Sequence, residues 1–509
     1  MLAAARALRA LGDVVVVTHG RADRREAEER FGWDLEDIGF VQRPERAADG
    51  ASLLVAGTEL FVNATHYSHL AAPCTASIKF EYFPVSKPEA ADRLLWTLGT
   101  MIAARIAGVA DGAGWYGPER IGRGWFRQSD GNGALVVHTA RPIRIWLSDM
   151  RPSAGAEGSV YRVVDERSNV LAGGVCGVRG QFTPTAWFRA PRRGAHVYVQ
   201  SVAQAGSAGP ESRLLGLSLG GIEVAGLTAH RMWEAISRRL LPAVGSALAR
   251  RQVADYARVY RSYAAVSPNS AYTAYWLKRW WGIDGHVIEP PVVAPQGGGE
   301  PRGPTILTIG RFFRGGHSKK HDVMVGAFRR MCDAGLRGWR FVLAGGVGER
   351  AEDRAYLAAI QRLAQGYPID VHPDADDTVV QRLRGQSSVY WHAAGFAEDA
   401  GRHPERFEHF GMAVAEAMAG GVPPVVYDGG GPRAYVRHRE NGLRWRTADQ
   451  LVELTLQLVR DAELRRRLGT RAADDVRSWS LERYEARVLA LAKHVLSETR
   501  ARPTPATPA

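Results

Sequence analysis

The chain has 509 residues, of which 45% are hydrophobic and 23% charged. This composition excludes a disordered chain, a collagen-like fibre and a heptad rod, and the length suggests about three domains. Lysine and arginine number 66 against 53 acidic residues, a net charge of +13, but the arginines are scattered, so we expect no nucleic-acid partner. No apolar run approaches about 18 residues, and the three separated cysteines fit a reducing compartment. We therefore expect a cytoplasmic protein without a membrane-spanning helix.

The chain opens with the pattern of a helix followed by a buried strand. Residues 1–11 are predicted to form a helix that ends at Gly12, and VVVVT is predicted to be the strand. In a doubly wound domain a strand and a glycine-rich turn precede such a helix, and neither is present. We therefore expect the first βα unit to be missing. Helices over 21–31 and 89–108 and the strands ELFVNAT and SIKFEYF continue the α/β pattern.

From residue 113 to residue 224 the pattern changes to short β-rich runs with glycine, proline and serine clusters between them. The runs are ALVVHT, IRIWLS, GSVYRVV, TAWFRA, HVYVQSV and LLGLSLGGIEV. Their spacing is typical of an all-β sandwich or barrel. A helix over 229–249 resumes the α/β pattern, which predicts that the β-rich segment is inserted. Its tryptophans could stack on sugars, but we expect core packing for Trp115, Trp125, Trp146 and Trp187.

A proline- and glycine-rich linker then leads into a second α/β domain. Its strands TILTIG, WRFVLAGG, IDVHP, SVYWHA and VPPVVYD alternate with helices, the pattern of a Rossmann-like sheet. The predicted division is an N-terminal Rossmann-like acceptor domain in two parts (1–112 and 225–290), the inserted β-sandwich (113–224), the linker (291–304), a C-terminal Rossmann-like donor-binding domain (305–477), a C-terminal helix (478–496) and a disordered tail (497–509). Two such halves facing a cleft suit a donor–acceptor transferase.

Two motifs of the second α/β domain carry candidate chemistry. In GRFFRGGHSKKHD, Arg311 and one of Lys319 and Lys320 follow a strand, where they could neutralise the diphosphate of a departing nucleotide without a metal. In ERFEHFGMAVAEAMAGG, Glu408 and Glu416 lie eight residues apart at the start of a small-residue helix. The first could reach a sugar hydroxyl and the second a ribose diol, while the backbone near Gly411 could meet a phosphate.

The motifs GRFFRGGHSKKHD, VLAGG, HPDA, EHFGMAVAEAMAGG and GGGP–ENGLRW together resemble family-4 (group 1) retaining glycosyltransferases of the GT-B fold, over residues 300–480. The N-terminal half resembles them more weakly, through LFVNATHYS, SIKFEYFP, NSAYT and VIEPPV. The branch most similar in detail is the lipid-linked-oligosaccharide mannosyltransferases, whose donor is GDP-mannose. The resemblance implies retaining transfer of a hexose from a GDP- or UDP-linked sugar to a glycan or lipid-linked acceptor, in polysaccharide biosynthesis, with no metal and no other cofactor.

The resemblance also implies roles for single residues. Arg311, Lys319 and Glu408 would be catalytic, and Lys319 is preferred to Lys320 because it matches the family pattern before His-Asp. The donor would be bound by Glu416, Phe410, Gly411, Met412, Gly345, His372, Pro373 and Lys320, and the acceptor side would include Asn63, His66 and Tyr82. Family members often carry a histidine before a Phe-Pro strand end. The segment FEYFP has none, so Tyr82 or Glu81 could take its place, or the role is unfilled.

Alternatives to this reading remain open. The chain could be a weakly active or inactive relative that binds glycan through the inserted β-sandwich, or a sugar phosphorylase or sugar-phosphate synthase on the same fold. Asp374-Ala375-Asp376 has the form of a metal–nucleotide motif, but two carboxylates alone make a poor metal site, so we expect none here. The basic surface would suit peripheral contact with the inner membrane face.

Overall fold

The structure is a computed structural model that describes residues 1–18, 24–42, 58–65, 72, 75–84, 104–105, 108–111, 115–121, 124–129, 132–149, 159–166, 169–176, 181–201, 204–205, 214–215, 217–227, 256–293, 302–348 and 350–501. The predicted helix over 229–249 lies outside the described residues. So do most of the predicted helix over 89–108, the middle of the linker, and the tail from residue 502 onward.

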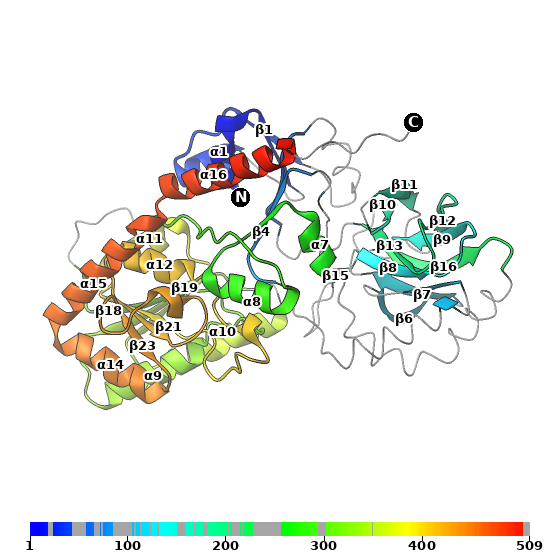
Figure 1. The fold of residues 1–509 in the computed structure, drawn as a ribbon. Coiled ribbons are helices and arrows are strands. Elements are labelled where there is room, and N and C mark those ends of the chain that lie inside the picture. Colours follow the sequence, from blue (N-terminus) through cyan, green and yellow to red (C-terminus); the bar gives the residue numbers. More distant parts are fainter. Residues whose placement is uncertain are drawn as a thin grey trace.

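The C-terminal half is built on one six-stranded parallel sheet (Figure 1). Its strands are β18 (Thr305–Ile309), β19 (Arg340–Gly345), β20 (Ile369–Pro373), β21 (Val389–His392), β22 (Pro424–Tyr427) and β23 (Leu443–Trp445). They lie in the order β20-β19-β18-β21-β22-β23, and every neighbouring pair is parallel. This is the 3-2-1-4-5-6 order of a doubly wound nucleotide-binding sheet, with its switch point between β18 and β21. The predicted Rossmann-like sheet is confirmed.

Helices cover both faces of this sheet, which explains why the central residues of its inner strands are apolar and buried. Neighbouring residues of one strand face opposite cores: Trp391 packs with Phe328 on one side, and Tyr390 packs with Met418 on the other. The helices are α9 (His321–Asp333), α10 (Ala351–Ala364), α11 (Asp377–Gln386), α12 (Met412–Ala419), α13 (Pro432–Tyr435), α14 (Ala448–Arg460) and α15 (Ala462–Val476). The first core also holds residues of α9, α10 and α14, and the second holds residues of α12 and α15.

The N-terminal half contains two small parallel sheets, which agrees with the predicted α/β pattern. Strands β1 (Val14–Thr18) and β2 (Ile38–Gln42) form one, and β3 (Phe61–Asn63), β4 (Ser77–Glu81) and β17 (Ala265–Pro268) form the other. The associated helices are α1 (Leu2–Leu8), α2 (Arg24–Phe31), α7 (Tyr256–Ser262) and α8 (Ala271–Trp281). As predicted, the first helical segment ends at Gly12, after a 3-10 turn over Arg9–Leu11. The expectation of a missing first βα unit stays a prediction.

Between β4 and β17 the chain forms two five-stranded antiparallel sheets. One has the order β11-β10-β13-β8-β5 and the other β12-β9-β16-β7-β6. Their strands are β5 (Val109–Asp111), β6 (Trp115–Ile121), β7 (Gly124–Ser129), β8 (Asn132–Val137), β9 (Ile143–Ser148), β10 (Ser159–Val164), β11 (Val170–Cys176), β12 (Thr183–Pro184), β13 (Ala195–Gln200) and β16 (Ser218–Val224). Both sheets contribute to a shared apolar core.

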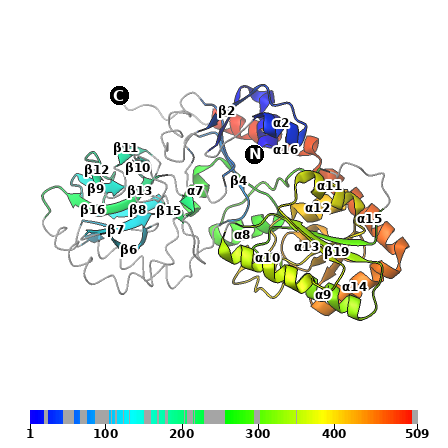
Figure 2. The same cartoon turned by 180° about the vertical axis from the view of Figure 1, so that it is seen from behind.

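The antiparallel sheets are an insertion, because β4 and β17 lie next to each other in one parallel sheet although the whole β-rich segment separates them in the sequence. We call this part the inserted module. It begins at β5, a few residues before the predicted boundary. In opposite views it lies at one end of the molecule, with α7 and α8 between it and the six-stranded sheet (Figures 1 and 2).

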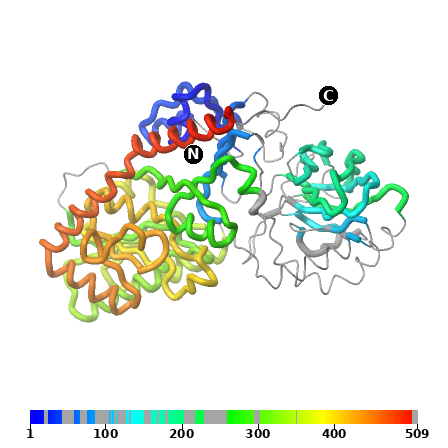
Figure 3. The backbone as a smooth tube through the Cα atoms, viewed as in Figure 1, coloured from blue at the N-terminus to red at the C-terminus, as the bar shows by residue number. Residues whose placement is uncertain are grey.

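The last helix, α16 (Leu481–Ala501), leaves the C-terminal half and returns to the N-terminal half (Figure 3). There it packs against α1 and β4 through a shared apolar core, and Arg6 Nε lies 2.5 Å from Glu485 Oε1. The helix continues five residues beyond its predicted end at residue 496. None of the helices in the described ranges has both the length and the apolar composition needed to cross a bilayer.

Candidate functional site

The loop after β18 brings cationic side chains to the switch point of the six-stranded sheet. Gly310 N donates to Ala344 O (2.9 Å), so the loop starts alongside β19. A Cβ added to Gly345 would lie 2.1 Å from Gly310 O, and one added to Gly310 would lie 2.6 Å from Lys319 Cγ. Glycine is therefore required at both positions, because any side chain would push the loop and Lys319 away. The ends of these strands are where doubly wound sheets bind ligands.

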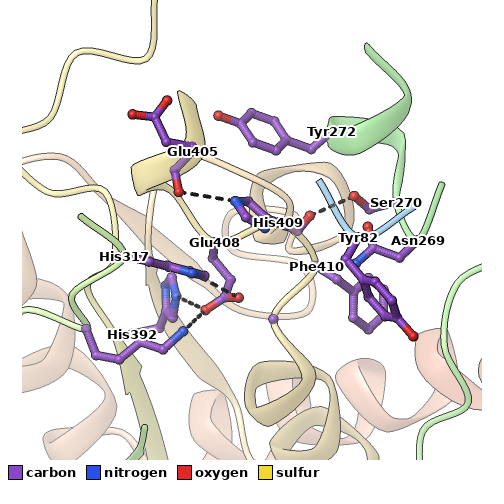
Figure 4. A network of polar contacts seen from close by, with 12 residues as sticks. Tyr82, Asn269, Ser270, Tyr272, His317, His392, Glu405, Glu408, His409 and Phe410 are labelled. Atoms are coloured by element: carbon purple, nitrogen blue, oxygen red, sulfur yellow. Dashed lines mark hydrogen bonds and ion pairs between the residues drawn. The ribbon is translucent and has the colours of Figure 1, made fainter. Parts of the chain in front are cut away.

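Glu408 lies at the centre of the site, where a lysine and two histidines surround its carboxylate from the loop after β18 and from the end of β21. Figure 4 shows this cluster. Lys319 Nζ lies 2.5 Å from Glu408 Oε2. His392 Nε2, at the end of β21, lies 3.4 Å from the same oxygen, and His317 Nε2 lies 3.7 Å from Oε1. Only 13% of the Glu408 side chain is exposed. A carboxylate this buried requires such partners, since an unpaired charge there would be costly.

Electrostatics fix the charge states of this cluster. Burial alone would raise the pKa of Glu408, but Lys319 and then His392 outweigh it and hold this pKa well below its usual value. Burial lowers the pKa of His317 to about 4, against the opposing effect of Glu408. Burial also lowers the pKa of His392. Near neutral pH the cluster is therefore a charged Lys319–Glu408 pair beside two neutral imidazoles.

The peptide after Glu408 turns into α12 through a strained glycine. Gly411 caps the helix with φ +94°, a left-handed conformation that disfavours other residues, and a Cβ there would lie 2.9 Å from Tyr435 Oη. Tyr435 donates to Phe410 O at 2.8 Å, and Gly431 N donates to Glu408 O at 2.7 Å. The N-cap residue Gly411 offers no side chain to the start of α12. Val414 N donates to Gly411 O at 3.0 Å, so the N–H groups of Met412 and Ala413 are the ones placed to meet an anion.

Two predicted donor residues flank this turn with different surroundings. Phe410 is buried and packs against Tyr435 and Trp479, so its side chain supports the turn. Met412, the first residue of α12, is 38% exposed.

Glu416, one and a half turns into α12, is paired with Arg384 of α11. The Glu416 side chain is 19% exposed and the Arg384 side chain 11%. Burial raises the pKa of Glu416, and Arg384 only partly opposes this effect. The motif therefore indicated Glu416 but not its ion-pair partner, Arg384.

The two other predicted cations differ in how they are paired. Arg311 is exposed, its guanidinium lies over the Phe313 ring at 5.7 Å, and no carboxylate among the described residues pairs with it. Lys320 Nζ instead lies 2.6 Å from Glu398 Oε1, which leaves it directed away from Glu408. Arg406 also contacts Glu398, at 3.0 Å. The two lysines therefore contact different carboxylates, and the preference for Lys319 as the donor residue stays a prediction.

The predicted base-side residues lie at the ends of β19 and β20. Gly345 pairs with Pro373 in the strand register, next to His372. The following Asp374 accepts the N–H of Val347 through its carboxylate at 2.8 Å. Asp376 caps α11 by accepting the N–H of Val379 at 2.8 Å. Both carboxylates of the Asp-x-Asp motif thus bind backbone, and no cluster of metal-ligating residues occurs in the described part of the chain.

The predicted acceptor-side residues lie near the ends of β3 and β4. Asn63 is buried and donates to Tyr263 Oη at 2.7 Å. Tyr82 is 36% exposed, and its carbonyl accepts the Thr273 hydroxyl at 3.0 Å. His66 lies outside the described residues. Glu81, the other candidate in this segment, accepts the Tyr260 hydroxyl at 3.0 Å.

The end of β4 also joins the two halves of the molecule at this site. Phe83 stacks on His409, the residue after Glu408, with ring centroids 4.0 Å apart. Ser270 Oγ donates to His409 O at 2.7 Å, and Tyr272 Oη donates to Pro404 O at 3.0 Å. Figure 4 shows Ser270 and Tyr272 across His409 from the Glu408 cluster.

Sequence reasoning missed several members of the site: His317, His392, Arg384 and His409. A signal for His392 was available, because it is a polar residue at the end of an otherwise apolar strand. Arg311 holds a similar position just after β18. In doubly wound sheets, residues at the carboxyl ends of the strands beside the switch point lie at the ligand site. No comparable local signal marks Arg384, which lies on an ordinary amphipathic helix.

A doubly wound sheet with a lysine–carboxylate pair at its switch point is typical of nucleotide-binding domains, and parallel sheets in both halves are typical of the GT-B fold. Residues 295–475 match the family described as "Glycosyl transferases group 1". This part of the chain is a group 1 glycosyltransferase domain, as the motifs predicted.

Individual relatives are distant. Over 161 residues the chain is 27% identical to the GDP-Man:Man(3)GlcNAc(2)-PP-Dol alpha-1,2-mannosyltransferase of Dictyostelium discoideum, and the match spans 31% of this chain and 30% of that protein. A sucrose-phosphate synthase structure from Thermosynechococcus elongatus is 21% identical with a TM-score of 0.38, covering 48% of this chain and 61% of that one. The Anabaena HepE structure in complex with UDP and glucose is 15% identical with a TM-score of 0.37, covering 52% and 75%.

Proposed function

We propose that this protein transfers a hexose from a nucleotide-diphosphate sugar to a glycan or lipid-linked acceptor, with retention and without a bound metal. The observation that carries the proposal is the cluster around Glu408. In it Lys319 and Glu408, which are 89 residues apart in the sequence, form a partly buried pair at the switch point of a doubly wound sheet. The exposed Arg311 adds a second cation at the end of the same strand, β18.

In this proposal the donor diphosphate lies between Arg311, Lys319 and the first N–H groups of α12. Transfer breaks the bond from the anomeric carbon to the diphosphate, and the acceptor oxygen takes its place on that carbon. The proton of the acceptor hydroxyl passes to the departing diphosphate oxygen. The departing diphosphate gains negative charge, which the two cations and the helix N-terminus stabilise. Glu408, with its pKa held low, is an acceptor for a sugar hydroxyl, and Glu416 is an acceptor for the ribose diol.

The choice of sugar follows from one relative and from the motifs. The Dictyostelium relative is named for a GDP-mannose donor, and the motifs resemble the same branch of the family. We therefore favour mannose from GDP-mannose, with UDP-linked glucose or galactose as the next choice. The acceptor side would be formed by the ends of β3 and β4, which approach the Glu408 cluster through Phe83.

The test is calorimetric binding of GDP, UDP and ADP to the full chain and to the double variant Lys319→Ala, Glu416→Ala. We expect saturable binding of one nucleotide, which names the base, and loss of at least about tenfold in affinity in the double variant, since both changes remove charge-assisted hydrogen bonds. Lys278→Ala is the matched control, because this lysine of α8 is also paired with a carboxylate, Asp284, and is not among the predicted site residues. Failure of a folded chain to bind any of the three nucleotides would contradict the proposal.

Once the base is known, sugars linked to that nucleotide can be tested as donors with simple hexose acceptors. The anomeric configuration of the product, read by NMR coupling constants, distinguishes retention from inversion. A folded chain that binds a nucleotide but never transfers its sugar would favour the alternative, a relative that binds glycan without turnover.

A further inference from the structure

Two tryptophans of the inserted module, Trp146 and Trp187, lie outside its apolar core. Trp115 is fully buried and belongs to the core, as expected. Trp187, however, is 44% exposed, and Trp146 is partly exposed on the outward face of β9. The expectation of core packing is therefore wrong for Trp187 and for Trp146. The side chain of Trp125 lies outside the described residues.

The backbone beside β9 is irregular at the point where Trp187 stands. Thr185 N donates to Ile145 O at 2.8 Å, and Phe188 and Ile143 exchange two hydrogen bonds of 2.8 and 2.9 Å. Two residues of this segment, 186 and 187, thus stand opposite a single residue of β9, residue 144. This is a β-bulge, a feature that bends a strand and redirects a side chain.

The bulge turns Trp187 over the side chain of Arg144. The Arg144 guanidinium carbon lies 4.7 Å from the Trp187 ring centroid and 5.6 Å from that of Trp146, two residues along the same face. Arg144 Nε also donates to Glu223 Oε2 of β16 at 2.8 Å. The guanidinium is therefore held by two indoles and a carboxylate, which fixes the position of both rings.

A glycine on the neighbouring strand leaves the side chain of Trp146 uncovered on that side. In the register of β9 and β16, Trp146 stands opposite Gly221, which has no side chain to cover the indole. A second register irregularity occurs between Leu219 and Gly221. A Cβ on Gly220 would lie 2.4 Å from the Phe182 ring, so that ring rests directly on the Gly220 backbone.

We propose that Trp146, Arg144 and Trp187 form a glycan-binding site on the inserted module, separate from the donor site. The apolar C–H face of a hexose ring suits an exposed indole, and its hydroxyls suit the fixed donors and acceptors of the Arg144–Glu223 pair. Because this pair is neutral overall, the surface selects a neutral glycan over an anionic one. A guanidinium–carboxylate pair lies at its centre, unlike the apolar core of a protein interface.

The test is affinity electrophoresis of the full chain through gels containing neutral α-mannan, β-galactan or dextran. We expect at least one polysaccharide to retard the protein. Trp187→Ala and Trp146→Ala should each weaken the apparent affinity about tenfold, while Trp187→Tyr, which keeps a flat ring, should retain most of it. Phe31→Ala is the matched control, because Phe31 is a 45% exposed aromatic residue outside the module.

Nucleotide calorimetry on the same variants separates this inference from the proposed donor site, since none of the three tryptophan variants should change nucleotide affinity. The proposal is overturned if no polysaccharide retards the wild-type chain, or if the tryptophan variants are retarded as strongly as wild type. It is also overturned if the variants change the sedimentation coefficient instead, because the surface would then join two copies of the chain.

Discussion

Phe83 of the N-terminal half stacks on His409 of the C-terminal half, with ring centroids 4.0 Å apart and ring planes inclined by 13°. Because Glu408 precedes His409, this contact couples the end of β4 to the acidic centre of the proposed donor site. His317 lies on the other side, 4.9 Å from His409 between centroids. The two halves therefore meet through a column of rings directly beside the Glu408 cluster.

Replacing Phe83 by leucine should test this coupling. Leucine keeps apolar volume but loses the stacking, which is worth about 1 kcal/mol. We expect nucleotide affinity to stay within about twofold and kcat to fall about tenfold, because only the relative placement of donor and acceptor changes. Phe31→Leu, at an exposed position far from the site, is the control. A proportional loss of nucleotide affinity would show that Phe83 supports the donor site itself.

Removing the cation of the central pair should affect both stability and binding. Lys319→Ala leaves Glu408 in a mostly buried position without its closest partner. Breaking such a pair costs about 2–4 kcal/mol of unfolding free energy, somewhat less than for a fully buried pair. We expect this loss in urea unfolding at neutral pH, together with weaker nucleotide binding by calorimetry. Unchanged affinity in a folded Lys319→Ala variant would exclude Lys319 from the diphosphate site.

The neutral histidines predict a specific loss of stability in mild acid. The pKa of His317 is lowered to about 4 in the folded chain, whereas it returns toward 6.5 on unfolding. The unfolded state therefore binds more protons between these values, and the free energy of unfolding falls as the pH falls from 6.5 to about 4. Glu408, whose folded pKa is depressed, loses its contribution only below its unfolded value of 4.5.

Urea unfolding at about pH 7, 6 and 5 measures this slope. His317→Gln should reduce it, because glutamine does not titrate. His403→Gln, at a histidine with 43% of its side chain exposed, should leave it close to wild type. Equal slopes in wild type and His317→Gln would contradict the assignment of a buried neutral imidazole at this position.

Gly411→Ala should damage the start of α12. The backbone at Gly411 has φ +94°, and a methyl group would lie 2.9 Å from Tyr435 Oη and 3.1 Å from Glu408 Cγ. We expect a loss of about 1–3 kcal/mol in unfolding free energy and weaker nucleotide binding. Gly326→Ala in the middle of α9, where a Cβ would meet nothing within 4 Å, should instead stabilise the chain by about 0.5–1 kcal/mol. Similar effects of the two substitutions would argue against a special role for the Gly411 backbone.

Much of the fold could be predicted because its elements are local patterns. The strand Val14–Thr18 is a short apolar run, and the strand Ile369–Pro373 alternates apolar and polar residues; each forms where the pattern places it. The run TAWFRA was predicted as a strand, but it contains the bulge at Trp187. Alternation of apolar and polar residues predicts a strand, but it does not reveal whether the neighbouring strand pairs with it residue for residue or through a bulge.

The sequence by itself determined which residues carry the proposed chemistry in the C-terminal half, because Arg311, Lys319, Glu408 and Glu416 lie in motifs of fixed local spacing. Only the tertiary structure decided their partners. Arg384 meets Glu416 across 32 residues and Lys319 meets Glu408 across 89, while Phe83 reaches His409 from the other half of the molecule. Such pairs depend on how helices and strands pack, and the free energy that selects them comes from burial throughout the core, which no single segment encodes.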